Sequence, residues 1–231
     1  MSGARATSSY VIAATGLKAE AHIAARSPGT IAVAGGGDSA RLETLIEEAL
    51  GNDCRGIVSF GLAGALRPNL RPGACLIGSE VVHGSNRYRA DGAWTARLRA
   101  RLPRAEVVGF AGVDRPLVTS AQKLALFAAT GAAAADMESH VAARVAARRA
   151  LPFAVLRVVA DPQERDVPAA ALAGMRSDGT TDAGAVLRAL GKEPGHIPQL
   201  MHVAADAARA FWALLRCHGR VGAGFGLIDL G

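Results

Sequence analysis

The segment that most constrains the fold of this chain is Leu151–Asp161, an apolar, β-branched run with one Arg inside it and an Asp at its end. A small-residue segment that opens with Asp136 and Glu138 precedes it. This order predicts a helix followed by a buried strand. Ligands of open α/β sheets usually bind where strands end and helices begin. We therefore expect Arg157, Asp161 and the acidic pair to meet at one edge of a sheet.

Apolar runs also recur along the N-terminal half, where they alternate with segments of helical composition. This alternation is typical of α/β folds, and 231 residues suit one large domain without internal repeats, residues 1–231. The predicted strands and the helices that follow the first two are Tyr10–Ala14, Leu17–Arg26, Thr30–Ala34, Ser39–Leu50 and Gly56–Phe60.

The rest of the chain is divided in the same way. Gly61–Leu66 predicts a turn whose small residues either let a flat ligand lie against the backbone or let a helix pack closely. The glycine-rich end, residues 221–231, is predicted to be mobile. The other predicted elements are strands Ala74–Val82 and Ala105–Gly112, a helix Ser120–Ala129 with Ser120 as N-cap, a loop Pro162–Pro168, and helices Ala169–Met175, Asp182–Leu190 and Gln199–Cys217.

Composition narrows the possible partners. No apolar stretch approaches the ~20 residues of a membrane-spanning helix, and the first ten residues lack a signal-peptide pattern, so we expect a cytoplasmic protein. The net charge of +6 is scattered except at Arg97–Arg104. That basic cluster lacks the aromatics that stack bases, so no nucleic-acid partner is expected. It is either a solvated helix face or a peripheral contact to a membrane surface, for a cytoplasmic protein the inner membrane.

Metal and nucleophile motifs are missing from the sequence. The six histidines show no HxxxH or HxxE spacing, so we expect them not to cluster and expect no metal site. No G-x-S-x-G signature occurs. An odd number of cysteines without CxxC spacing indicates reduced packing residues: Cys54, Cys75 and Cys217. The chemistry is therefore expected to come from carboxylates.

A glycine-rich turn follows the second predicted strand. Gly35, Gly37 and Ala40 match the G-x-G-x-x-A spacing of dinucleotide-binding folds, but this is the second βα turn and no acidic residue ends the next strand. Two interpretations stay open for Gly35, Gly36 and Gly37. Their backbone N–H groups hold a phosphate at the helix N-terminus, or the glycines serve a tight turn with positive φ.

Three segments in the same order and spacing resemble a known family of enzymes. Asp136–Asp161, Thr15–Glu20 and Phe60–Leu66 are similar to the 5′-methylthioadenosine/S-adenosylhomocysteine nucleosidases of the nucleoside phosphorylase and nucleosidase superfamily. Together with Val33–Asp38, the sequences of these segments look most like those of the hopanoid-biosynthesis-associated phosphorylases. The resemblance implies a single three-layer αβα domain with a mixed, twisted central sheet. It also implies a homo-oligomer, a dimer or a hexamer, without metal or organic cofactor.

The resemblance assigns the catalytic roles to two carboxylates. Asp161 would protonate purine N7, provided that burial raises its pKa, and Glu20 would activate the attacking water. Each residue also has a purely structural interpretation. Glu20 is placed to stabilise the start of a helix, and Asp161 is placed to begin a turn.

Substrate contacts are implied by the same resemblance. Glu138 would bind the ribose hydroxyls and Met137 the face of the sugar, while Ala63 and Gly64 would line the nucleoside. Val118 would contact the base, or it belongs to the core. Arg157 is interpreted in three ways, because it would orient Glu20, hold an incoming phosphate or neutralise buried Glu138.

The nucleophile is left open by the sequence. Resemblance to the hopanoid-associated enzymes implies inorganic phosphate as co-substrate, so that adenosylhopane, a lipid-linked nucleoside, gives adenine and phosphoribosylhopane. Lys18 and Gly35–Gly37 would then hold the phosphate. The phosphate-using purine nucleoside phosphorylases carry Arg and Ser where this chain has Ser59 and Leu62. Hydrolysis of methylthioadenosine or adenosylhomocysteine is the alternative reaction, and a non-catalytic nucleoside- or lipid-sensing module is the alternative class.

Overall fold

The computed structural model describes residues 9–168, 180 and 197–227. Its helices are α1 (Lys18–Ala24), α2 (Ser39–Ala49), α3 (Gly92–Arg101), α4 (Ser120–Thr130), α5 (Ser139–Arg148), α8 (Ile197–Val221) and the short 3₁₀ helix η2 (Ala223–Gly226). Its strands are β1 (Tyr10–Thr15), β2 (Thr30–Ala34), β3 (Cys54–Ala65), β4 (Cys75–His83), β5 (Asn86–Arg89), β6 (Glu106–Gly112), β7 (Ala134–Asp136) and β8 (Phe153–Asp161).

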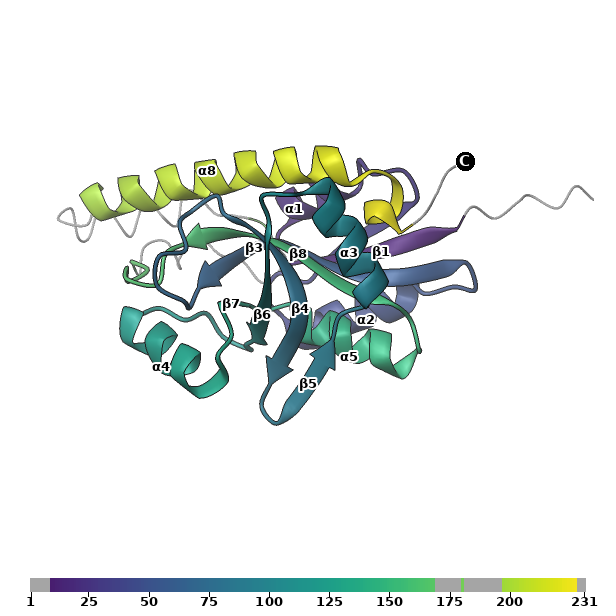
Figure 1. Ribbon diagram of the computed structural model, residues 1–231, viewed down its shortest axis with the longest axis horizontal. Helices are drawn as coiled ribbons and strands as arrows, with labels where there is room; N and C mark the ends of the chain where they lie inside the picture. The colour runs from purple at the N-terminus through teal and green to yellow at the C-terminus, as the bar shows by residue number, and fades with distance from the viewer. Residues whose placement is uncertain (1–8, 169–179, 181–196, 228–231) are drawn as a thin grey trace, which may run out of the picture.

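All eight described strands belong to one mixed sheet (Figure 1). Its order is β2-β1-β3-β7-β6-β4-β5, and β8 pairs with both β3 and β4. Strand β3 is parallel to β1 and β8 but antiparallel to β7. Because β8 also pairs with β4, β4 with β6, and β6 with β7, the strands β3, β8, β4, β6 and β7 form a closed ring of pairings. The C-terminal ends of β3 and β8 therefore meet next to β7.

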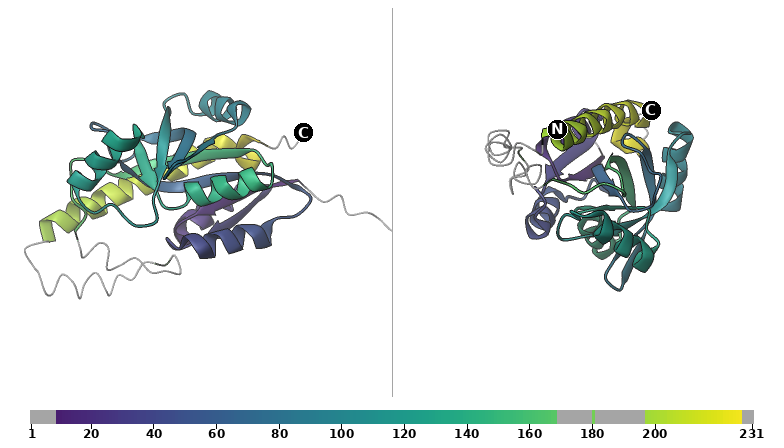
Figure 2. Two further views of the ribbon diagram at one scale, coloured as in Figure 1. Left: turned by 90° about the horizontal axis from the view of Figure 1, so that it is seen from below. Right: turned by 90° about the vertical axis from the view of Figure 1, so that its left-hand side faces the viewer.

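Helices cover both faces of the sheet, which confirms the predicted three-layer fold (Figures 1 and 2). Side chains of β1 alternate between the two faces. Val11 and Ala13 pack in one buried cluster with residues of α1, α3 and α8. Ile12 and Ala14 pack in the other with residues of α2 and α5. Among the described helices, none is long and apolar enough to cross a membrane.

Most of the predicted strands and helices of the N-terminal half are confirmed within two residues, and the strand Thr30–Ala34 has the predicted bounds. The predicted turn Gly61–Leu66 is wrong, because β3 continues to Ala65. Backbone pairing explains the difference: β3 bonds to β8 as far as Gly64 and then to β7. These partners are remote in sequence, so local glycine content misleads the prediction.

Two short strands were missed for a similar reason. Strand β5 lies between the predicted strands Ala74–Val82 and Ala105–Gly112, where no strand was predicted, and it pairs antiparallel with β4. Strand β7 occupies the start of the segment expected to open a helix, so that helix begins only at Ser139. Three or four residues are too few to show a periodic pattern.

Helix α4 begins where predicted, but its N-cap is Thr119 and not Ser120. The Thr119 hydroxyl accepts a hydrogen bond from the Gln122 N–H, and the Gln122 side chain accepts one from the Thr119 N–H. This reciprocal pair is a capping box. Its Gln lies three residues after Thr119, which identifies the cap in the sequence.

The prediction of a mobile tail is wrong for the residues up to 227. Phe225 is fully buried, with its ring 5.0 Å from that of Phe60, and its carbonyl accepts a hydrogen bond from Trp94 Nε1 at 2.9 Å. One aromatic side chain thus fastens a glycine-rich segment by apolar burial. The last helix, α8, is longer than predicted at both ends. The predicted helices Ala169–Met175 and Asp182–Leu190 lie outside the described residues.

Candidate active site

A cavity of about 300 Å³ opens at the edge of the sheet where β3 and β8 end. Segments distant in sequence form its wall: the β1–α1 turn, the end of β3, the loop after β6, the β7–α5 junction and the end of β8. Four carboxylic acids line it, and most of its other residues are apolar or glycine. The acids are Glu20, Asp136, Glu138 and Asp161.

Glu20 is held in place from both sides of the cavity. Its Oε2 atom accepts hydrogen bonds from the N–H groups of Gly16 and Leu17 at 2.9 and 2.8 Å, and its Oε1 atom accepts one from the Leu62 N–H at 2.8 Å. Only 2% of the residue is exposed. Burial raises the pKa of Glu20, although the charge of Arg157 and the three N–H groups favour the anion. Glu20 therefore caps its own helix and also faces the cavity.

Gly61 is required where it lies against Glu20. A Cβ atom at this position would come within 2.6 Å of the Glu20 carboxyl carbon and Oε1, and the φ angle of Gly61 is +148°. Only glycine adopts such a backbone without strain. The close approach of β3 to α1 places Glu20 at the end of the sheet.

Glu138 shares a buried cation with Asp136. The Nη1 atom of Arg157 lies 3.0 Å from Glu138 Oε2, and its Nη2 atom lies 3.4 Å from Asp136 Oδ1. Arg157 is 1% exposed and also donates to the Ser59 hydroxyl and the Leu62 carbonyl. Burial raises the pKa of Glu138 to about 7, with Arg157 opposing this rise. Of the three interpretations of Arg157, neutralising Glu138 is the one with a direct contact.

Asp136 was expected at this edge of the sheet, but the sequence reasoning gave it no role in the site. Its Oδ1 atom accepts hydrogen bonds from the N–H groups of Glu138 and Ser139, and its Oδ2 atom accepts one from the Ser139 hydroxyl. It thus caps the start of α5 and fixes the backbone that carries Glu138. The signal in the sequence is an Asp three residues before a Ser that begins a helix.

Asp161 also lines the cavity, and it contacts a cation that the sequence reasoning missed. The Nζ atom of Lys123, on α4, lies 2.5 Å from Asp161 Oδ2. Lys123 is 1% exposed and also donates to the carbonyls of Pro162 and Arg165. Burial raises the pKa of Asp161, while Lys123 works in the opposite direction. A Lys on a helix 38 positions earlier offers no local sequence signal for this contact.

The other predicted substrate contacts divide into two groups. Ala63, Gly64 and Met137 line the cavity. Val118 is not among the described lining residues, and its neighbour Leu117 lines the cavity instead. The backbone of Val118 is bonded elsewhere, its N–H to Gln122 and its carbonyl to the N–H of Val167. The contact of Val118 with the base stays a prediction.

The predicted phosphate site has few donors to offer. The N–H groups of Gly35 and Gly36 donate to the carbonyls of Thr15 and Gly16 at 2.9 and 2.8 Å. Gly36 and Gly37 line the cavity with φ angles of +71° and +79°, as a tight turn requires. Lys18 is exposed and is not among the described lining residues. The geometry favours the tight-turn interpretation.

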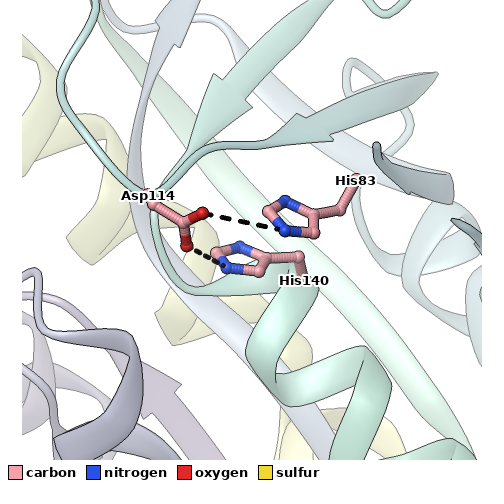
Figure 3. A group of neighbouring side chains, drawn as sticks. All are labelled: His83, Asp114 and His140. Atoms are coloured by element: carbon pink, nitrogen blue, oxygen red, sulfur yellow. Dashed lines mark hydrogen bonds and ion pairs between the residues drawn. The ribbon is translucent and has the colours of Figure 1, made fainter. Parts of the chain in front are cut away.

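Two histidines meet outside this cavity, so the expectation that the histidines do not cluster is wrong for this pair. The rings of His83 and His140 stack with centroids 4.2 Å apart, and the carboxylate of Asp114 faces both (Figure 3). The two histidines are 57 positions apart, which explains why motif spacing did not find them.

Comparison with known proteins places the chain in a family. A family model described as the phosphorylase superfamily matches residues 29–191, which is more than half of the chain. The chain belongs to the phosphorylase superfamily. The superfamily predicted from Asp136–Asp161 and the two shorter segments is therefore confirmed. A search of curated proteins found no match.

Solved structures share the fold of this superfamily member at low sequence identity. A 5′-methylthioadenosine/S-adenosylhomocysteine nucleosidase from Helicobacter pylori matches with a TM-score of 0.63 and 12% identity, covering 91% of this chain and 98% of that one. An S-adenosylhomocysteine nucleosidase from Streptococcus pyogenes gives 0.63 and 14%, covering 93% and 98%. Futalosine hydrolase of Helicobacter pylori gives 0.60 and 14%, covering 67% and 88%.

Proposed function

We propose that this chain is an enzyme that cleaves the bond between the base and the ribose of a purine nucleoside. The observation that carries this proposal is that Glu20, Glu138 and Asp161, from three distant parts of the chain, line one cavity. Breaking this bond builds positive charge on the sugar and negative charge on the base. Carboxylates on one side and a proton donor on the other stabilise both charges.

Asp161 is the proposed acid. As the C1′–N9 bond breaks, its electron pair moves to the purine, and the proton of the Asp161 carboxyl passes to N7. Burial raises the pKa of Asp161, which favours the protonated form that this step needs. Lys123 then stabilises the carboxylate that remains, at 2.5 Å. Gly64 lies close to this acid: a Cβ atom at position 64 would lie 3.1 Å from Asp161 Oδ1.

Glu138 is the proposed ribose ligand. Its carboxylate accepts hydrogen bonds from two neighbouring hydroxyls and offsets the positive charge of the sugar. Met137 lies next to it on the cavity wall, with its soft side chain available to the sugar. Arg157 is not among the described lining residues, but its ion pair with Glu138 fixes the position of that carboxylate.

Water is the nucleophile that the geometry favours. Glu20 is anchored by three N–H groups at the cavity wall, in position to take a proton from an attacking water. Among the described residues, two cations lie at or next to the cavity, and each contacts a carboxylate: Lys123 contacts Asp161, and Arg157 contacts Glu138. Both cations are thus already paired, and the acids of the wall that are ionised would repel a phosphate.

Phosphorolysis is the second candidate, and membership in the phosphorylase superfamily favours it. Inorganic phosphate would then be the co-substrate. The resemblance to hopanoid-associated enzymes further implies adenosylhopane as substrate. An apolar wall that includes Leu17, Val113 and Pro116 suits a nucleoside with a hydrocarbon substituent at C5′. Such a substrate would bring the enzyme to a membrane, where the exposed arginines of α3 offer positive charge.

Adenine release from adenosylhopane and from methylthioadenosine, each with and without phosphate, tests this function. Full activity in phosphate-free buffer supports hydrolysis, and strict dependence on phosphate supports phosphorolysis. Asp161→Asn should lower kcat by about 10²-fold or more, since general acid catalysis contributes that much. Glu48→Gln, on the exposed side of α2, is the control. Tight nucleoside binding without turnover by the wild type would instead indicate a sensing module.

A further inference from the structure

His83, Asp114 and His140 come from three segments that the sheet brings together. His83 ends β4, Asp114 lies two residues after β6, and His140 is in the first turn of α5. Strands β4 and β6 are parallel, and so are β6 and β7, which leads into α5. The positions of the three residues are therefore set by backbone pairing and not by flexible loops alone.

The stacked rings of His83 and His140 both point their Nε2 atoms at the carboxylate of Asp114 (Figure 3). Nε2 of His140 lies 3.1 Å from Asp114 Oδ1, and Nε2 of His83 lies 3.8 Å from Asp114 Oδ2. One ligand atom from each residue lies within 4.8 Å of the other two. Ligands of a tetrahedral zinc ion lie about 3.3 Å apart, given Zn–N distances of ~2.0–2.1 Å. The distance between His140 and Asp114, 3.1 Å, is close to this value.

A backbone carbonyl next to His83 favours the tautomer that a metal ligand needs. Its Nδ1 atom lies 3.1 Å from the carbonyl oxygen of Gly112 and donates to it in the tautomer protonated at Nδ1. That tautomer leaves the lone pair of Nε2 facing Asp114. Histidines that bind metals usually donate their other N–H in this way. The Ser39 hydroxyl donates to Asp114 Oδ1 at 3.2 Å and so orients the carboxylate as well.

His140 is the buried histidine of this cluster, and its Nε2 atom is the one that faces Asp114. The residue is 1% exposed, and its Nδ1 atom has no hydrogen-bond partner among the described residues. Nearby Gly112 has no side chain, and a Cβ there would lie 2.3 Å from the Cβ of His140. The backbone thus leaves room for the buried ring.

We propose that His83, Asp114 and His140 bind one divalent transition-metal ion of the zinc class. Two imidazole nitrogens and one carboxylate oxygen suit zinc, whereas Mg²⁺ and Ca²⁺ prefer oxygen ligands. The side chain of Asp114 is 62% exposed, so it can move inward to complete the site. The exposed side leaves the fourth position to water.

The site is separate from the proposed nucleoside site but adjoins it. None of the three ligands is among the described residues that line the cavity, whereas Val113, beside Asp114, does line it. The N–H of Val113 donates to the carbonyl of Asp136, a carboxylic acid of the cavity wall. A bound ion would therefore tie the loop after β6 to α5 and fix one wall of the cavity.

Metal titration of the full chain tests the proposal without measuring nucleoside cleavage. Protein stripped with a chelator is titrated calorimetrically with Zn²⁺, and Co²⁺ binding is followed by its visible absorption. We expect one ion per chain and the intense bands of a tetrahedral Co²⁺ site. His83→Ala and Asp114→Ala should each weaken binding by about 100-fold or more, since even outer-shell changes cost ~10–100-fold. Mg²⁺ should not compete.

The control for these variants is His202→Ala, which removes an exposed histidine from α8. It should bind Zn²⁺ like the wild type. Equal binding by the wild type and His83→Ala, or no binding by the wild type, overturns the proposal. Circular dichroism of each variant shows that it is folded, which is expected because the side chain of Asp114 is exposed and that of His83 is only half-buried. Loss of nucleoside cleavage alone has no bearing on this result.

Discussion

The ammonium group of Lys123, on helix α4, lies 2.5 Å from the carboxylate of Asp161 at the end of β8. The same Nζ atom donates hydrogen bonds to the carbonyls of Pro162 and Arg165. Lys123 is therefore a positioning residue that fixes both the acid and the loop that follows it.

Lys123→Met should lower kcat/KM for nucleoside cleavage by about 10²-fold, because the remaining carboxylate loses its cation. Lys123 opposes the rise in the pKa of Asp161, so its removal raises that pKa further. Because the acid must be protonated, the alkaline limb of the pH–rate profile should move to higher pH. A loss of rate with an unmoved alkaline limb would mean that Lys123 only supports the loop.

Glu138 should make stability depend on pH. Burial raises its pKa from 4.5 to about 7, so the folded protein holds a proton that the unfolded chain has released between these values. The stabilisation is complete below about pH 4.5 and is lost as pH rises through about 7. Relative to Glu138→Gln, the free energy of unfolding of the wild type should fall by up to about 3 kcal/mol over this range.

Urea unfolding of both proteins at a series of pH values measures this difference. Glu48→Gln, at an exposed position of α2, is the matched control and should differ from the wild type by a constant amount. A constant difference for Glu138→Gln as well would contradict the prediction.

Gly61→Ala should disturb Glu20 and the strand that faces it. The new methyl group would lie 2.6 Å from the Glu20 carboxyl, and the backbone would be held at φ +148°. We expect a loss of about 1–3 kcal/mol of stability from overpacking and backbone strain, with lower activity. Gly92→Ala is the control, because a Cβ there meets nothing within 4 Å. Similar thermal unfolding of both variants would refute this role of Gly61.

Arg157→Met should be the most destabilising of these changes. It leaves Glu138 and Asp136 buried without the cation that contacts both. Removing one partner of a buried ion pair typically costs about 3–5 kcal/mol. Arg97→Met, at an exposed position of α3, should change the free energy of unfolding by less than about 0.5 kcal/mol. Chemical denaturation at pH 7 compares the two.

Local patterns identified the elements whose residues carry their own signal. Thr30–Ala34 was predicted with its observed bounds because its apolar run is flanked by turn residues. Acidic Glu20, Glu138 and Asp161 were found because each follows a recognisable strand or motif, and all three line one cavity. An apolar run without a charged residue fixes no register, and here Leu117, not the predicted Val118, is among the described lining residues.

The sequence by itself determined the α/β class, the superfamily and three of the four acids in the cavity, because burial periodicity and short motifs are local properties. The tertiary structure decided that Lys123 contacts Asp161, that Phe225 fastens the chain end, and that His83, Asp114 and His140 meet. These contacts depend on which strands pair and in what register. Pairing is set by the packing of the whole chain, so no local pattern records it.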